Sequence, residues 1–184
     1  MAQRMKQPQT ANRIIGTEEN DILIGTNKID IMNGRAEDDN IKGSNNDDVI
    51  KGSDGNDRIF GERGDDVIRG NDGVYDIIGG RGHDELHGGK GNDTLKGNSG
   101  GDRLEGGAGA DLLTGGNGSD IFVINSTLAG LADGPDRFLD FRLKVDKIAF
   151  DTEVASDAIA MTNVGSHLHI KVKIDDVEIV AAIM

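Results

Sequence analysis

The stretch GGRGHDELHGGKGNDTLK, from Gly79 to Lys96, holds two consecutive copies of one nine-residue pattern. Each copy has Gly at the first, second and fourth places, Asp at the sixth and Leu at the eighth. Outward from this stretch, in both directions, the pattern recurs from residue 16 to residue 124. A fixed short period is the sequence signature of a solenoid, in which each repeat packs on its neighbours.

Three columns of residues keep this period. The sixth place is acidic in every repeat but one, at Asp21, Asp30, Asp39, Asp48, Asp57, Asp66, Asp84, Asp93, Asp102, Asp111 and Asp120. The first place is glycine without exception, at Gly16, Gly25, Gly34, Gly43, Gly52, Gly61, Gly70, Gly79, Gly88, Gly97, Gly106 and Gly115. The eighth place is always apolar, at Leu23, Met32, Ile41, Ile50, Ile59, Ile68, Ile77, Leu86, Leu95, Leu104, Leu113 and Phe122. Chance does not produce three coincident columns of this length.

The composition of each repeat predicts its local structure. The first six places carry residues that tolerate left-handed backbone, which predicts a turn, and the last three carry most of the Ile, Val and Leu, which predicts a short strand. Side chains alternate across a strand, so Ile59 points inward while Arg58 and Phe60 point outward. Two repeats per coil turn place odd and even repeats in two facing parallel sheets. The predicted fold class is all-β, a parallel β-roll.

Composition and charge exclude several classes of function. The 184 residues include 28 Gly but only 3% aromatic residues, and the net charge of −13 disfavours nucleic acid and anionic membranes as partners. The absence of Cys removes disulfides and thiolate chemistry. No segment approaches the roughly 20 apolar residues of a membrane span, and residues 1–13 lack the apolar run of a classical export peptide. A cation is the partner that this charge favours.

The repeats resemble the RTX, or haemolysin-type calcium-binding, family, whose consensus is GGxGxDxUx with U apolar. The match is closest in the two copies quoted above and in GGAGADLLT (106–114) and GGNGSDIFV (115–123). The resemblance implies a right-handed parallel β-roll with Ca²⁺ in the turns. We therefore expect a lead at 1–13, a calcium-binding roll at 14–124 and a C-terminal β cap at 125–184.

Calcium takes 6 to 8 oxygen ligands, and glycine-rich turns supply backbone carbonyls beside the carboxylates. In the family, an ion lies between turns stacked two repeats apart, so it is shared by Asp side chains 18 residues apart. The expected ligands are Asp57, Asp66, Asp84, Asp93, Asp102, Asp111 and Asp120, with Gly55, Gly64, Gly80, Gly82, Gly89, Gly91, Gly100, Gly107, Gly109, Gly116 and Gly118. The alternative is a metal-free ladder whose Asp side chains accept backbone N–H groups. That ladder explains the Asp column but leaves the fourth-place glycine without a reason.

Two departures from the pattern predict uneven sites. The first four repeats lack the fourth-place glycine, so weaker sites are expected at Asp21, Asp30, Asp39 and Asp48. Tyr75 replaces the sixth-place acid of its repeat, and the neighbouring Asp76 is expected to begin the strand and face away from the turn. We expect the coil to pass through this repeat without an insertion, but with a gap in the carboxylate column.

The C-terminal segment is expected to close the roll. The stretch DRFLDFRLKVDKIAF, from Asp136 to Phe150, resembles the closing segment of secreted RTX proteases and of alginate epimerase repeat modules. Alternation from His167 to Ile174 predicts a strand, with a hairpin turn at 175–176 into residues 177–183. The tail DDVEIVAAIM resembles the uncleaved signal read by type I secretion systems. His167 and His169 are read as surface residues, as are His83 and His87, because no third metal ligand is evident.

No catalytic constellation or phosphate loop is present in the sequence, so the chain is predicted not to be an enzyme. The leading hypothesis is a calcium-binding module that is exported by type I secretion and folds outside the cell. One alternative is the non-catalytic C-terminal part of a larger secreted RTX enzyme. Another is a surface-binding module, in which an outward column of Lys51, Arg69 and His87 follows an anionic polysaccharide. The simpler interpretation of that column is a solvated face without a ligand, and Glu105 is the next residue of the same column.

Overall fold

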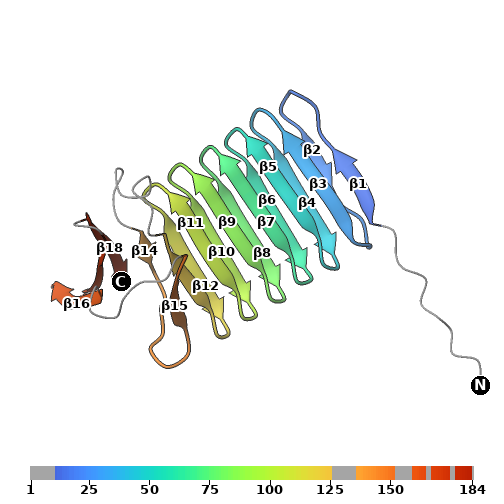
Figure 1. Ribbon diagram of the computed structural model, residues 1–184. Helices are drawn as coiled ribbons and strands as arrows, with labels where there is room; N and C mark the ends of the chain where they lie inside the picture. Colours follow the sequence, from blue (N-terminus) through green and yellow to red (C-terminus); the bar gives the residue numbers. More distant parts are fainter. Residues whose placement is uncertain (1–10, 126–135, 152–158, 165–166, 175–176, 184) are drawn as a thin grey trace, which may run out of the picture.

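The computed structural model describes residues 11–125 and 136–151 in full, and the backbone of three strands at 159–164, 167–174 and 177–183. Its strands stack as successive rungs, with β1 at one end and β16 and β18 at the other (Figure 1). The described residues contain strands, turns and bends but no helix. They therefore include no helix long and apolar enough to cross a membrane.

Odd and even repeats form two separate sheets, as the period of nine predicts. The first sheet consists of β1 (Asn12–Ile15), β3 (Asp30–Arg35), β5 (Val49–Asp54), β7 (Val67–Asp72), β9 (Glu85–Lys90), β11 (Arg103–Ala108), β13 (Ile121–Ile124) and β15 (Lys147–Phe150). The second runs from β2 (Ile22–Ile24) through β4 (Asn40–Asn45), β6 (Arg58–Arg63), β8 (Asp76–Arg81), β10 (Thr94–Ser99), β12 (Leu112–Asn117) and β14 (Arg137–Phe138) to β18 (Val177–Ile183), β17 (His167–Ile174) and β16 (Ile159–Val164). The predicted all-β, parallel β-roll is confirmed.

The apolar column forms the core between the sheets. Parallel pairing joins residues 18 apart, so Ile50 lies beside Ile68 and Ile59 beside Ile77. Every eighth-place residue from Met32 to Phe122 is at most 1% exposed. Each rung buries only one or two apolar side chains, so the stacking of many rungs is what assembles a core.

The division of each repeat into turn and strand differs from the prediction. Full-length rungs have strands of six residues, as in β5 and β6, and turns of three. The first three places of the next repeat also pair with the neighbouring rung: Asn98 lies opposite Gly80 and Gly116. A left-handed residue at the second place does not interrupt this pairing, because every rung carries the same deviation at the same position. The six-plus-three division was wrong for this reason.

The roll extends beyond the nine-residue repeats at both ends. At the N-terminal end β1 begins at Asn12, whose Nδ2 donates to Asp30 Oδ1 at 3.0 Å. Residues 1–10 of the expected lead lie outside the described residues. At the C-terminal end β14 and β15 each add a strand to one sheet. Phe122 there meets Phe138 and Phe141 with ring centroids 5.0 and 5.8 Å apart, so aromatic side chains cover the last rung.

The predicted C-terminal hairpin is confirmed at the level of the backbone. β17 and β18 pair antiparallel over their whole length, and β18 also pairs parallel with β14. The expected turn at 175–176 lies outside the described residues, as do the side chains of His167 and His169. The hairpin thereby joins the sheet of the even repeats.

Candidate metal sites at the turns

The sixth-place carboxylates form two ladders inside the roll rather than a fringe on its surface. Those from Asp30 to Asp120 are at most 4% exposed. In each from Asp39 to Asp120, Oδ1 accepts the backbone N–H of the residue 18 positions earlier, as Asp84 does from Asp66 at 2.9 Å and Asp102 from Asp84 at 2.9 Å. One ladder passes along each edge of the roll. The hydrogen bonds anticipated for a metal-free ladder are therefore present, but they use only one oxygen of each carboxylate.

The second oxygen of most of these carboxylates is buried without a hydrogen-bond partner. This holds for Oδ2 of Asp39, Asp48, Asp57, Asp66, Asp84, Asp93, Asp102 and Asp111. A buried, unpaired carboxylate oxygen is costly, and a column of such oxygens requires a physical explanation. A bound cation would satisfy them, whereas a metal-free ladder leaves them unsatisfied.

The raised pKa values of the ladder carboxyls reflect the same unfavourable burial of their ionised form. Burial is the main cause, and neighbouring carboxylates add to it, so the pKa rises to about 7 for Asp48, Asp84 and Asp93. Burial likewise raises the pKa of Asp57 and Asp66 to about 6. The pKa of Asp102 is also raised to about 6, again mainly by burial. A positive charge within the turn would restore the ionised form.

The invariant first-place glycine leaves open the space that faces these oxygens. A Cβ on Gly61 would lie 2.3 Å from Asp66 Oδ2 and 2.6 Å from the carbonyl oxygen of Gly79 on the next rung. The same clash occurs at Gly97, where a Cβ would lie 2.2 Å from Asp102 Oδ2. A carboxylate oxygen and a backbone oxygen thus border one small space that any larger residue would fill.

The donor set suits a hard cation that accepts backbone oxygens. Among the described residues, no three His, Asp or Glu side chains converge on one point. An ion here would therefore be bound by carboxylates of the ladder together with backbone carbonyl oxygens. Calcium accepts both kinds of ligand.

Hydrogen bonding divides the first four repeats into two pairs. In the first repeat, Thr17 donates its N–H to Asp21 Oδ2 at 2.5 Å. In the second, Thr26 donates to Asp30 Oδ2 at 2.6 Å. In the third and fourth, the Oδ2 atoms of Asp39 and Asp48 have no partner. Glu37 and Asn46, at the fourth place of these two repeats, have positive φ values of 66° and 73°, below the 114° to 159° of the glycines at this place in the later repeats. The occupancy of every turn stays a prediction.

Tyr75 leaves the predicted gap in the carboxylate column, and its buried ring occupies the space. Its backbone N–H donates to Asp93 Oδ1 at 2.9 Å, and β8 keeps register with both neighbours, so the predicted continuity of the coil is confirmed. The ring is 2% exposed, and its hydroxyl donates to the carbonyl of Ser53. Asp76 faces outward as predicted, 3.3 Å from Arg58 Nε. A phenol O–H here supplies a hydrogen-bond donor where the other rungs of this ladder present a carboxylate.

A second, outer ladder runs along the turns and was not expected from the sequence. On one edge, Asp38 Oδ1 accepts the N–H of Asn56, and Asn56 Oδ1 accepts that of Val74. On the other, Asp47 Oδ1 accepts the N–H of Asp65 at 2.9 Å. The frequent Asn or Asp at the fifth place was the sequence signal for this ladder.

The carboxylate ladders continue into the cap. Asp136 Oδ1 accepts the N–H of Asp111 at 3.2 Å, and Asp146 Oδ1 accepts that of Asp120 at 3.1 Å. Burial raises the pKa of Asp136 to about 8, with the Asp111 carboxylate beside it adding to the shift. Both acids begin an Asp-x-apolar triplet, DRF and DKI, which repeats the sixth-to-eighth-place pattern off the nine-residue beat. That triplet was the signal that period counting missed.

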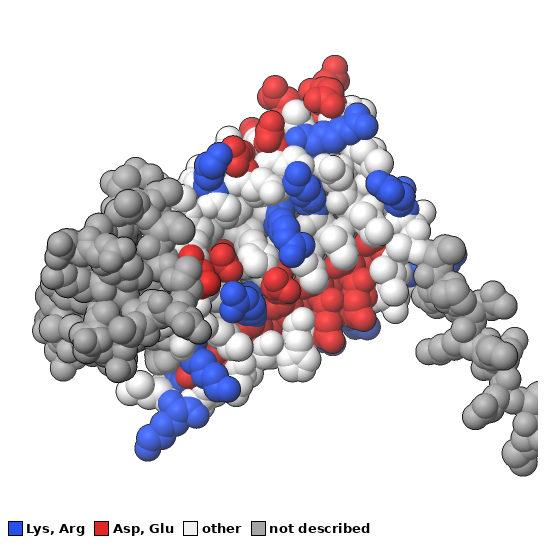
Figure 2. Space-filling view, in the orientation of Figure 1, with Lys and Arg blue, Asp and Glu red and all other residues white. Residues whose placement is uncertain are grey.

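The outward column proposed for an anionic polysaccharide exists but is neutralised by its neighbours. Lys51, Arg69, His87 and Glu105 lie side by side on successive strands. His87 Nε2 lies 2.6 Å from Glu85 Oε1, its Nδ1 lies 3.5 Å from Glu105 Oε2, and Arg69 lies 3.9 Å from Glu85. Hydrogen bonds from the imidazole to Glu105 and, to a smaller extent, to Glu85 raise the pKa of His87, whereas burial lowers it. Figure 2 shows acidic side chains at the top of the roll and in a larger patch in its lower part, and basic side chains across the middle and at the margins.

A parallel solenoid whose turns present buried carboxylates beside glycine carbonyls has the architecture of a β-roll with oxygen-lined turns. The family model for the RTX calcium-binding nonapeptide repeat matches four stretches, residues 15–49, 42–74, 76–102 and 96–123. The chain therefore belongs to the RTX calcium-binding repeat family, whose cofactor is Ca²⁺.

Two solved structures illustrate the likeness. The AlgE6R3 subunit of the Azotobacter vinelandii mannuronan C5-epimerase is 28% identical, with 60% of this chain and 70% of that one covered and a TM-score of 0.45. The extracellular lipase LipA of Serratia marcescens is 20% identical, with 84% of this chain and 42% of the lipase covered and a TM-score of 0.32. No curated protein matches the sequence.

Proposed function

We propose that this RTX module binds Ca²⁺ between successive turns of each edge and that this binding drives folding of the roll. The observation that carries the proposal is the column of buried Oδ2 atoms without partners. Rungs lie about 4.8 Å apart, so ionised carboxylates repel their neighbours along each edge unless cations separate them. The apolar column alone buries too little per rung to offset this repulsion and the cost of ordering the turns.

The ligands in this proposal are the predicted ones, with two additions and with the exception of Gly118 O and Asp120 Oδ2, which contact Arg142. Asp39 and Asp48 join the stronger group because their Oδ2 atoms are also unpaired. Asp21 and Asp30 remain the weaker candidates because threonine N–H groups already satisfy them. When bound, calcium supplies positive charge between the rungs. The chain supplies the carboxylates, the carbonyls and the first-place glycines that leave room.

Circular dichroism at pH 7.5 tests the proposal directly. The chain should be largely unfolded in EDTA and β-rich in 10 mM calcium. This concentration exceeds the dissociation constants of extracellular calcium modules, which extend to about 10⁻³ M. Calcium should also raise the melting temperature through linkage. Magnesium at equal ionic strength is the control, because it demands stricter octahedral geometry at shorter distances. Identical spectra in EDTA and calcium would contradict the proposal.

We further propose that the module acts outside the cell, where millimolar calcium is available, after type I secretion in an unfolded state. The family membership and the acidic-then-apolar tail support this proposal. The module is proposed to be non-catalytic, either by itself or as the C-terminal part of a larger secreted enzyme. Fusing residues 125–184 to a reporter and measuring its export by a type I system tests the signal.

A second candidate function, binding of an anionic polysaccharide, has better support on the face of the even repeats than on the column first considered. Lys42 and Arg58 lie 5.4 and 5.1 Å from the ring centre of Phe60. A hollow of about 460 Å³ beside this ring is lined by Arg63 and Arg81, which occupy adjacent rungs, and by one acid, Glu62. Replacing both arginines with Gln should weaken binding of polygalacturonate and leave calcium-driven folding unchanged. Neutral dextran is the control, and equal polygalacturonate binding by the variant would exclude this face.

A further inference from the structure

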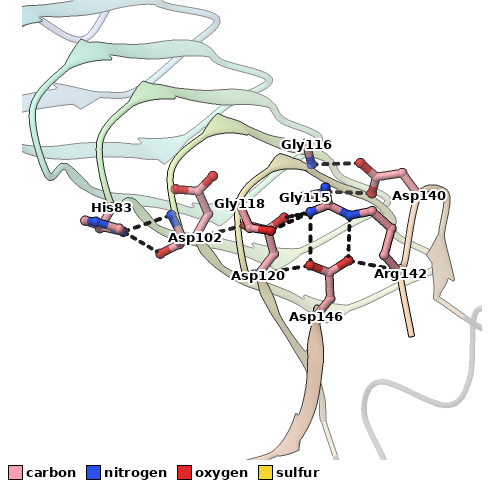
Figure 3. Close-up of polar contacts among 10 residues, drawn as sticks. His83, Asp102, Gly115, Gly116, Gly118, Asp120, Asp140, Arg142 and Asp146 are labelled. Atoms are coloured by element: carbon pink, nitrogen blue, oxygen red, sulfur yellow. Dashed lines mark hydrogen bonds and ion pairs between the residues drawn. The ribbon is translucent and has the colours of Figure 1, made fainter. Parts of the chain in front are cut away.

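The cap places a positive side chain in the last turn of one edge. Arg142 lies between β14 and β15, and its guanidinium points at the turn that ends in Asp120 (Figure 3). Nη2 lies 2.6 Å from the carbonyl oxygen of Gly118, 3.1 Å from Asp146 Oδ1 and 3.4 Å from Asp120 Oδ2. Nε lies 3.2 Å from Asp146 Oδ2. One nitrogen is thus surrounded by two carboxylates and a backbone carbonyl.

These oxygens are the counterparts of those that stand unpaired elsewhere on the same edge. Asp84 and Asp102 each bury an Oδ2 without a partner, whereas Asp120 Oδ2 meets Arg142. Gly118 occupies the fourth place of its repeat, and Asp146 continues the ladder beyond Asp120. The side chains of Asp120 and Asp146 are 0% and 1% exposed, so both carboxylates depend on an internal partner.

We propose that the guanidinium of Arg142 takes the place of a calcium ion at the junction between this edge of the roll and the cap. The inference rests on the proposed calcium binding of the other turns and concerns which turn does not take an ion. The cap would then dock on this edge through its own charge, independently of the calcium concentration.

Contacts and charge both oppose an ion beside the guanidinium. Calcium binds oxygen at 2.3 to 2.6 Å, so an ion joined to Gly118 O and Asp120 Oδ2 would compete with Nη2 for the same two oxygens. An arginine side chain stays protonated in proteins, and its planar fork suits carboxylates. The ion would therefore have to displace Arg142 from four hydrogen bonds within this site.

A neighbouring contact holds the same cap segment against the same turn. Asp140 Oδ1 and Oδ2 accept the N–H groups of Gly115 and Gly116 at 2.8 and 2.7 Å. The segment that carries Arg142 is therefore anchored without a metal on both sides of the last turn. The aromatic contacts of Phe122 add apolar burial to this junction.

Calcium stoichiometry tests the proposal. Equilibrium dialysis against ⁴⁵Ca²⁺ should give one more ion per chain for Arg142→Ala than for the unaltered chain, because the variant removes the guanidinium from four oxygens. Lys147→Ala, which removes the same charge from an exposed position in β15, should leave the number unchanged. Arg142→Lys should also leave it unchanged. An Arg142→Ala variant that binds the same number of ions as the unaltered chain would overturn the proposal.

A measurement on the unaltered chain guards against misfolding of the variant. At saturating calcium the Nε–H of Arg142 should exchange slowly in NMR, because it remains bonded to Asp146. Rapid exchange at saturating calcium would show that an ion has displaced the side chain and would overturn the proposal. A chain that binds no calcium at all would instead refute the proposed function, so the two failures are distinguishable.

Discussion

Acid should fold the roll in the absence of calcium. Six ladder carboxyls have pKa values raised to about 6 or 7: Asp48, Asp57, Asp66, Asp84, Asp93 and Asp102. Their ordinary value is about 3.9 in an unfolded chain. A group whose pKa is higher in the folded state binds its proton more tightly there, so it favours folding at low pH. That contribution is complete below about pH 4 and is lost as the pH rises through 6 to 7.

The expected steepness follows from the number of groups. Each carboxyl that is protonated in the folded state and ionised in the unfolded state changes the free energy of unfolding by about 1.4 kcal/mol per pH unit. Six such groups titrating together set an upper limit of about 8 kcal/mol per pH unit near pH 5. Even a third of that is large beside a total stability of roughly 5–15 kcal/mol.

Circular dichroism in EDTA, recorded from pH 4 to pH 8 at constant ionic strength, measures this effect. We expect β structure near pH 4.5 and its loss by pH 7.5, with the opposite trend in calcium because protons then compete with the ion. Asp84→Asn should flatten the pH dependence in EDTA and lower the number of bound ions. Glu62→Gln, which removes an exposed negative charge outside the carboxylate ladders, is the matched control. A metal-free chain with the same spectrum at both pH values would refute the reasoning.

Three further perturbations are expected to separate the parts of the roll. Tyr75→Asp should increase the number of calcium ions bound on its edge but raise the calcium concentration needed for folding, because removing a buried aromatic ring costs about 3–5 kcal/mol. An unchanged number of bound ions would contradict this, and Tyr75→Phe is the control for loss of the hydroxyl. Gly61→Ala should lower the calcium affinity and the melting temperature, because its Cβ would lie 2.3 Å from a buried carboxylate oxygen. Lys51→Ala on the exposed face should change neither. Equal calcium titrations of the two variants would disprove that the first-place glycine leaves space for the ion. Phe138→Ala should destabilise the closed end of the roll by about 3–5 kcal/mol, measured as a higher calcium midpoint, while Leu139→Ala, which is 36% exposed, should have a much smaller effect; a midpoint for Phe138→Ala no higher than that for Leu139→Ala would argue against capping.

The sequence by itself determined the solenoid. Three columns recur every nine residues: the apolar residues from Met32 to Phe122, the first-place glycines and the sixth-place acids. A period of nine with alternating side chains is compatible with two parallel sheets around one core. The inward direction of Ile59 and the outward directions of Arg58 and Asp76 followed from the same alternation. These features are local or strictly periodic, so counting along the chain was enough to find them.

Only the tertiary structure decided what each turn holds. When the rungs stack, Asp66 Oδ1 accepts the N–H of Asp48 and Oδ2 is left without a partner. The spacing of residues along the chain does not reveal this difference between the two oxygens. Left-handed backbone at Glu37 arises because neighbouring rungs impose the turn, although its own preference opposes it. Arg142 and Asp146 reach the last turn at irregular intervals of 22 and 26 residues from Asp120. Their roles depend on contacts between segments that do not share the repeat, and such contacts exist only once the chain has folded.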